Sequence, residues 1–215
     1  MDLSRALTAD EREAFRARLC EAVRHRFAQL GPDGVTMRGL ASDLGCSPMT
    51  PYSYFASKED ILAAVRADAF RRLADLCESA AEAADGELAR AGAIGRAYLR
   101  FALSEPEAYR IMFELSQPDI RGFPDLAEQV DRARRFMAQP TEILVRRGVL
   151  AGDAAQLAEM FWAASHGVIV LHMTGKLAPE TDVEGLYARI ASSLMRGNRG
   201  PRFAEVEAAL VPGGA

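Results

Sequence analysis

Between residues 36 and 58 the chain concentrates side chains that suit contacts with nucleic acid. Short hydroxyl side chains, which can reach phosphate oxygens or base edges, recur at Ser47, Thr50 and Ser53. Met49 can contact a thymine methyl group, and Tyr52 and Tyr54 each combine a flat ring with a hydroxyl donor. The chemistry favoured here is recognition rather than bond cleavage.

An enzyme needs a nucleophile with its base, a metal cluster or a phosphate loop, and none of these has a signature here. The sequence holds no GxGxxG, GxxxxGK[ST], HExxH or GxSxG. His166 and His172 are six residues apart and do not share a helix face, so they do not form a metal pair. We therefore predict no catalytic residue, no metal and no cofactor, and an enzyme without a recognisable motif stays an alternative.

The elements that position these side chains are two short helices joined by a tight turn. Thr36 is a good N-cap for a helix over residues 36–44, and Gly45 can end it in the left-handed conformation. Ser47 caps a second helix, predicted over residues 48–55, in which Pro51 falls within the first turn. Helix, glycine turn and helix form a helix-turn-helix, whose second helix enters the DNA major groove.

The rest of the chain is predicted to be all-α, with about nine helices. Apolar residues recur at spacings of three and four, and no stretch alternates with period two. Besides the two short helices, we expect helices over residues 8–30, 58–83, 87–103, 107–115, 126–148 with a kink or break at Pro140, 154–176 and 183–196. The tail after residue 196 is expected to be only partly ordered.

Composition restricts the location and the partners. The net charge of −4 does not indicate a nucleic-acid binder, so any basic surface must be local. The first residues lack a secretory signal, no apolar run reaches the length that spans a bilayer, and the three scattered cysteines suit a reducing compartment. These observations predict a cytoplasmic protein without a membrane partner.

Residues 34–62 resemble the N-terminal domain of TetR-type transcriptional regulators. The shared features include the Leu40-Ala41 pair, Ser47 at the start of the second helix, Tyr52, and Ser57-Lys58-Glu59. Trp162, followed by His166-Gly167, is similar to a signature of one class of TetR-type C-terminal domain.

The resemblance implies a homodimer with DNA-binding heads and a C-terminal body that binds a small ligand and pairs the subunits through its last two helices. The corresponding limits are residues 1–60 for the helix-turn-helix domain, 61–200 for the helical domain and 201–215 for a tail. The family's DNA contacts fall on Thr36, Arg38, Ser47, Met49, Thr50, Tyr52, Ser53, Tyr54 and Lys58.

The second helix departs from strong base readers because residues 48–55 contain neither lysine nor arginine. Arginine reading of guanine is therefore unavailable there, and we expect reliance on phosphate contacts and DNA shape. Arg38 and Lys58 supply positive charge at the borders, although both could be ordinary surface cations. Tyr52 has the alternative role of holding the domain together, whereas Phe55 is expected in the core.

The C-terminal half contains large apolar side chains with few polar groups, which suits a small apolar or aromatic effector. The candidates for such a site are Phe101, Tyr109, Met112, Phe113, Phe136, Met137, Trp162 and His166. Ordinary core packing is the alternative for each of them.

Two helices carry an apolar seam, which on residues 154–176 is formed by Leu157, Phe161, Ala164, Val168 and Leu171. The seam fits a four-helix dimer interface, or alternatively packing inside one subunit. The predicted function is a homodimeric repressor, released from a palindromic double-stranded DNA operator by the effector. The alternative outside enzymes is a helical small-molecule-binding or adaptor protein that does not bind DNA.

Overall fold

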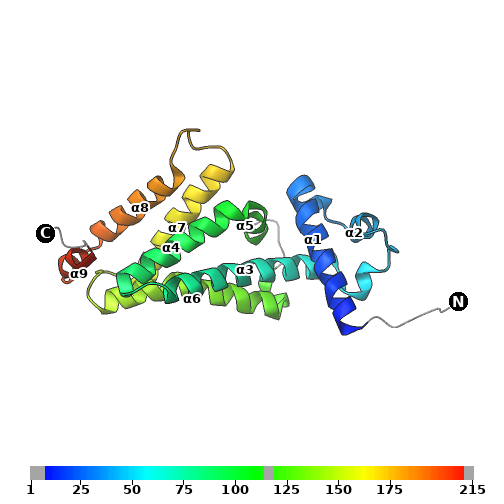
Figure 1. Ribbon diagram of the computed structural model, residues 1–215, viewed down its shortest axis with the longest axis horizontal. Helices are drawn as coiled ribbons and strands as arrows, with labels where there is room; N and C mark the ends of the chain where they lie inside the picture. Colours follow the sequence, from blue (N-terminus) through cyan, green and yellow to red (C-terminus); the bar gives the residue numbers. More distant parts are fainter. Residues whose placement is uncertain (1–7, 114–118, 211–215) are drawn as a thin grey trace. The chain divides into compact units, whose positions relative to one another are not determined.

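A computed structural model describes residues 8–113 and 119–210, the side chains of 209 and 210 excepted, and confirms the all-α prediction (Figure 1). These residues form no strand, and a single antiparallel bridge joins Leu150 and Arg199. The α-helices are α1 (Ala9–Gly34), α2 (Met37–Asp43), α3 (Lys58–Glu82), α4 (Glu87–Ser104), α5 (Pro106–Met112), α6 (Pro124–Arg146), α7 (Ala154–Met173), α8 (Val183–Gly197) and α9 (Phe203–Leu210). Two 3-10 segments, η1 (Pro51–Ser53) and η2 (Ile120–Gly122), complete the described elements.

The chain divides into two compact units. The first contains the residues up to Phe70 together with Glu107–Val130, and the second contains Arg71–Pro106 and the residues from Asp131 onward. These units differ from the predicted limits at residues 60 and 200, because the start of α3 and part of α5 pack with the N-terminal helices.

The core of the first unit is built on the apolar stripe of α1. Leu19, Val23 and Phe27 recur every four residues and are almost fully buried. The helix-turn-helix contributes Met37, Leu40 and Phe55, and the later elements contribute Ile61, Val65 and Ile111. Phe55 therefore points inward, as predicted.

The predicted boundaries of α2 are confirmed by its caps. The Thr36 hydroxyl accepts a hydrogen bond from the Gly39 amide at 3.1 Å, and Gly45 follows with φ 63°. At the preceding boundary, α1 formally continues to Gly34, but Gly31 has φ 71° and interrupts it one residue after the predicted end.

The α-helix predicted over residues 48–55 is wrong, since this segment is a turn followed by η1. The amides of Thr50, Ser53 and Tyr54 each donate to the carbonyl three residues earlier, at 2.8–3.0 Å. Pro51 has no N–H with which to donate to the Ser47 carbonyl, and that carbonyl accepts from Thr50 instead. The prolines thus favour the tighter 3-10 geometry. We call residues 47–54 the recognition segment.

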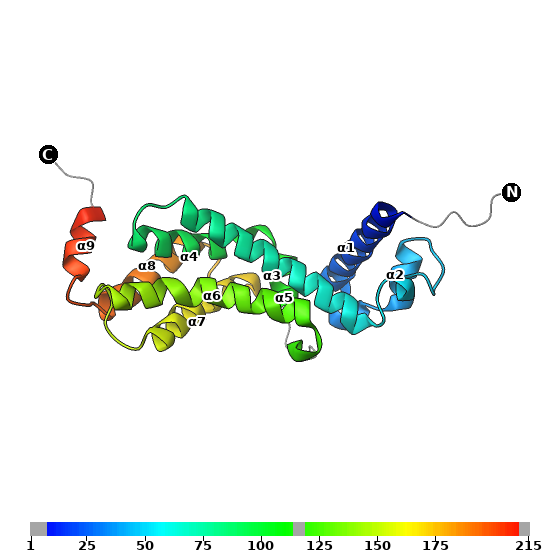
Figure 2. The same ribbon diagram turned by 90° about the horizontal axis from the view of Figure 1, so that it is seen from below.

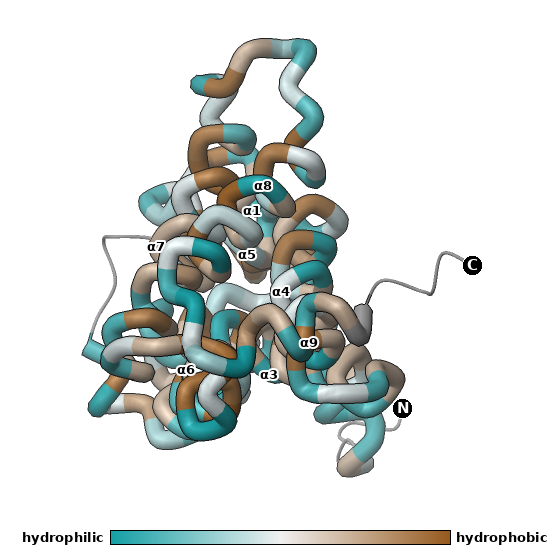
Figure 3. The backbone as a smooth tube through the Cα atoms, turned by 90° about the vertical axis from the view of Figure 1, so that its left-hand side faces the viewer, coloured by the Kyte–Doolittle hydropathy of each residue, from teal (hydrophilic) through white to brown (hydrophobic). Residues whose placement is uncertain are grey.

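In the second unit α7 and α8 lie side by side, and α6 lies beside the second half of α3 (Figure 2). Arg132 of α6 holds the latter pair, because its guanidinium donates to Asp75 at 2.8 Å and to Glu78 at 3.0 Å. Hydrophobic and hydrophilic residues alternate along the helices (Figure 3), so each presents an apolar face to its neighbours. α6 runs unbroken through Pro140, so the predicted interruption is a continuous helix.

Two further expectations need correction. The part of the tail that the structure describes forms α9, whose Phe203 is 5% exposed and packs against Leu144, Val149, Leu150 and Leu157. Secondly, the 20 residues of α7 are long and apolar enough to cross a membrane by length and composition, and 28% of the most apolar window is buried. The sequence search for an uninterrupted apolar run missed α7 because Glu159 and two histidines lie within it.

Candidate nucleic-acid interface and ligand cavity

The recognition segment exposes its larger side chains and is anchored by its smaller inward face. Met49 is 68% exposed and Tyr52 is 49% exposed, both high for apolar groups in a folded chain. Ser47 and Ser53 are also exposed, Thr50 is half-buried, and Pro51 is buried. The segment therefore presents a thioether, a phenol and two hydroxyls outward.

Two of the predicted DNA contacts also have intramolecular partners. The Tyr54 ring lies 4.9 Å from the Phe15 ring, with the Arg12 guanidinium 5.8 Å above it. Lys58 Nζ donates to the Pro32 carbonyl at 2.7 Å, and thereby ties α3 to the end of α1. These two residues help to hold the unit together, whereas Thr36 and Arg38 are exposed at the start of α2.

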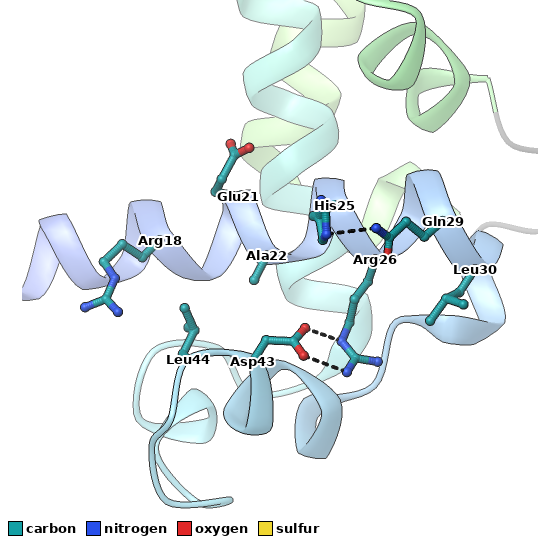
Figure 4. A pocket seen from close by; sticks show the side chains of 9 residues that line it. All are labelled: Arg18, Glu21, Ala22, His25, Arg26, Gln29, Leu30, Asp43 and Leu44. Carbon is teal, nitrogen blue, oxygen red and sulfur yellow. Dashed lines mark hydrogen bonds and ion pairs between the residues drawn. The ribbon is translucent and has the colours of Figure 1, made fainter.

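A bidentate ion pair fixes α2 on α1 (Figure 4). Arg26 donates from Nε and Nη2 to the two Asp43 carboxylate oxygens at 2.5 and 2.9 Å, and from Nη1 to the Gly34 carbonyl at 3.2 Å. The pairing raises the pKa of Arg26 and lowers the pKa of Asp43. Both groups therefore stay charged at neutral pH.

The Arg26–Asp43 pair borders a cavity of about 600 Å³ between α1 and the end of α2 (Figure 4). His25 and Gln29 lie on the same wall, with 3.0 Å between their side-chain nitrogens. Sequence reasoning considered Arg26 only as a charge for DNA and missed its structural role. No local signal could have found it, because the partners are 17 residues apart.

The predicted ligand residues do not gather at one place. Tyr109, Met112 and Phe113 belong to the first unit, where the Tyr109 and Phe113 rings are 4.8 Å apart and Phe70 packs on Phe113 at 6.0 Å. Phe101 belongs to the second unit and is buried, with the Arg72 guanidinium 5.9 Å from its ring. Their ligand-binding role stays a prediction.

Trp162 and His166 form a small cluster in the second unit. Their ring centroids are 6.3 Å apart, and the Trp162 indole N–H donates to the Tyr98 hydroxyl at 3.2 Å. Burial lowers the pKa of His166, so its neutral form is favoured in the folded chain.

The second unit contains a cavity of about 770 Å³ lined by α4, α6, α7, α8 and α9. Among the predicted ligand residues, Phe136 and Met137 line this cavity. Its polar lining includes residues that sequence reasoning did not assign to a ligand, namely Arg96, Arg100, Thr141, Ser165 and Tyr187. Burial raises the pKa of Tyr187, and hydrogen bonding to Ser165 opposes that shift. In the part of the chain that the structure describes, no group of three or more His, Cys, Asp or Glu residues could hold a metal.

A helix-turn-helix with an exposed recognition segment, joined to a helical unit with an internal cavity, defines a class of DNA-binding regulators. Comparison with known families places the chain within that class. Residues 19–65 match the model for bacterial regulatory proteins of the tetR family, and residues 91–194 match the model for a tetracyclin repressor-like C-terminal domain. The chain belongs to the TetR family of transcriptional regulators, which is not a class of enzymes.

Similar proteins agree with this assignment. Helix-turn-helix transcriptional regulators of Mycobacterium bovis and Mycobacterium tuberculosis are each 28% identical over 118 residues, which make up 54% of this chain and 50% of each relative. The chain thus spans about half the length of the curated relatives it matches.

Solved structures with the same fold include a Rhodococcus sp. RHA1 protein of unknown function and a TetR family regulator from Marinobacter aquaeolei VT8. The first has a TM-score of 0.74 and 24% identity, with 86% of this chain and 95% of that one covered. The second has a TM-score of 0.71 and 16% identity, with 90% and 100% covered.

Proposed function

We propose that this chain is a cytoplasmic repressor that binds a palindromic DNA operator as a homodimer and is released by a small apolar molecule. The observation that carries the proposal is the outward presentation of Met49 and Tyr52 on a segment that Pro51 and Phe55 anchor. Large apolar side chains are costly to expose to water unless a partner covers them, and a DNA groove is the partner that a helix-turn-helix offers.

The recognition segment reads DNA without arginine. Its Met49 thioether suits thymine methyl groups, and the hydroxyls of Ser47, Ser53 and Tyr52 suit base edges or phosphates. Arg38 is exposed near the N-terminus of α2, where the free amides and the helix dipole also favour a phosphate. This composition gives modest base discrimination, and sequence-dependent DNA shape supplies the remainder.

Pairing of two subunits compensates for the low charge of one head. On α7, Met160, Val170 and Leu171 are 37–45% exposed, and no residue of the neighbouring α8 is buried. A second copy packed on these two helices would bury the exposed side chains in a four-helix interface. Two linked heads bind adjacent half-sites far more tightly than one.

The effector acts by linkage. A ligand bound in the cavity of the second unit releases DNA by favouring a state in which the two recognition segments are wrongly spaced for successive major grooves. The effector is an apolar or aromatic molecule, consistent with the Phe136, Met137 and Phe161 side chains that line the cavity.

A mobility-shift titration with DNA from beside the chain's own gene tests DNA binding. We expect a shift that weakens steeply with salt, and a loss of roughly tenfold or more in affinity for Tyr52→Ala. Tyr52→Phe separates the ring from the hydroxyl, and Ser79→Ala, an exposed change on α3, is the matched control. If no salt-sensitive shift occurs at any protein concentration, the proposal fails and a helical protein without DNA binding takes its place.

A further inference from the structure

From the lining of the second cavity we infer that its ligand is an elongated apolar carboxylate. The charged end lies at Arg96 and Arg100 of α4, and the apolar end lies against Phe203 of α9. This inference rests on the proposed effector role of the cavity and specifies the chemistry and orientation of the molecule.

The charged end follows from two arginines that have no ionic partner. Arg96 and Arg100 are one helical turn apart on α4 and both line the cavity. Neither forms an ion pair within residues 8–113 and 119–210. Such a pair can bind a carboxylate through two guanidinium groups.

Two carboxylates from the start of α8 line the same cavity. The Asp182 side chain caps α8 by accepting from the Gly185 amide at 3.0 Å, so this carboxylate is already engaged. Glu184 is exposed in the first helical turn, where the α8 dipole offsets its charge. The unpaired cations therefore dominate the α4 wall.

The middle of the cavity is apolar with hydroxyls on one side. Phe136, Met137 and Phe161 provide apolar surface, and Tyr187 and Ser165 provide the hydroxyls. Arg96 lowers the pKa of Tyr187 by its charge, which is consistent with a guanidinium close to that phenol. A ligand lying along α4 thus passes from cations to hydroxyls and then to hydrocarbon.

The apolar end is closed by a strap that lies beyond the part of the chain matched by the family, which ends at residue 194. Amides of Ala151, Gly200 and Arg202 donate to carbonyls of Asn198, Val149 and Gly148, each at 2.9 Å. These bonds position Phe203, which is 5% exposed and lines the cavity. Phe203 therefore forms an end wall that limits how long a ligand can be.

The length of the site can be estimated from α4. Ala91 lies beside the α9 cluster and Arg100 lies at the other end of the lining. Nine residues of helix separate them, a distance of about 13 Å at the usual rise. An extended medium-chain carboxylate fits this distance better than a compact aromatic acid does.

The test measures binding of hexanoate, octanoate, decanoate and dodecanoate to the full chain by calorimetry, below their micelle concentrations. Decanol serves as the uncharged analogue. We expect an optimum near the middle of the series and weaker binding of decanol. The double variant Arg96→Gln/Arg100→Gln should bind decanoate roughly 10-fold to 100-fold more weakly and leave decanol unchanged.

The end wall is tested with Phe203→Ala, which should move the optimum towards dodecanoate. Val206→Ala is the matched control, because Val206 packs in the same cluster without lining the cavity. An unchanged length optimum overturns the role of Phe203, and equal loss of acid and alcohol affinity overturns the role of the arginines. If no acid binds the wild-type chain, the inference fails with the effector site, while the mobility shift measured without ligand still decides DNA binding separately.

Discussion

The hydroxyl of Tyr187 occupies the space beside Gly95 that a Cβ at this position would need. The absence of a side chain at Gly95 allows α8 to place a phenol directly against α4. Tyr187 and Gly95 both line the ligand cavity, so this close approach shapes its wall.

Gly95→Ala should not bring the stability that alanine usually gives in a helix. Alanine is favoured over glycine by up to about 1 kcal/mol, but here the new methyl group displaces the Tyr187 hydroxyl, whose hydrogen bond is worth about 1 kcal/mol. Gly197→Ala is the control, because a Cβ there meets nothing within 4 Å. Urea unfolding should show Gly197→Ala more stable than Gly95→Ala, and the reverse order would refute the role of the close approach.

Gly200→Ala should loosen the strap that carries Phe203. A Cβ at Gly200 would meet the carbonyl of Gly148, and backbone cannot move aside as a flexible side chain can. We expect a loss of about 1–3 kcal/mol in the free energy of unfolding, with new protease cleavage near residue 200. Wild-type stability and an uncut strap would show that the turn tolerates a side chain.

The Arg26–Asp43 pair should make stability depend on acid pH. The pairing lowers the pKa of folded Asp43 below its ordinary value of 3.8, so its stabilisation is complete above pH 3.8 and disappears as the pH falls through the lowered pKa. Asp43→Asn should be less stable than wild type by about 1 kcal/mol at pH 7, a modest cost because the pair is open to solvent. The two proteins should converge at lower pH, and a constant difference at every pH would contradict this assignment.

Arg38 and Lys58 should separate in a paired experiment. Arg38→Ala should weaken DNA binding, reduce the salt slope by about 1 and leave stability unchanged, as expected for a phosphate contact. Lys58→Ala loses the bond to the Pro32 carbonyl and should cost about 1–2 kcal/mol of stability. Mobility shifts at several salt concentrations and urea melts of both variants decide between these roles.

Leu171→Glu should give a monomer if α7 packs on a second copy. The side chain is 45% exposed in one chain, so the change costs little within the subunit but places a charge in the apolar interface. Ala178→Glu, an exposed change after α7, is the control. Sedimentation should find the control dimeric and Leu171→Glu monomeric, and two dimers would exclude this face as the interface.

Local patterns were sufficient to predict the fold class and several caps, because helix periodicity and capping act over a few residues. Thr36, Gly45 and the inward Phe55 are examples. The geometry after Ser47 was harder, since it depends on the hydrogen bonds that remain after two prolines have removed their donors.

Long-range pairings gave no local signal. Arg26 meets Asp43 across 17 residues, and Phe203 meets Leu144 from a segment that the composition indicated as a tail. The ligand candidates were chosen by side-chain type, and type alone does not reveal that Tyr109 and Phe136 lie in different units. Such relationships depend on packing, which a pattern of spacing does not encode.

The 3-10 geometry after Ser47 changes how this protein meets a surface. Side chains three residues apart eclipse one another in a 3-10 turn, whereas an α-helix fans them around its axis. Met49 then aligns with Tyr52, and Thr50 aligns with Ser53. The segment would offer two parallel ridges, one greasy and one hydroxylated, and a partner would be read as two adjoining tracks of different polarity.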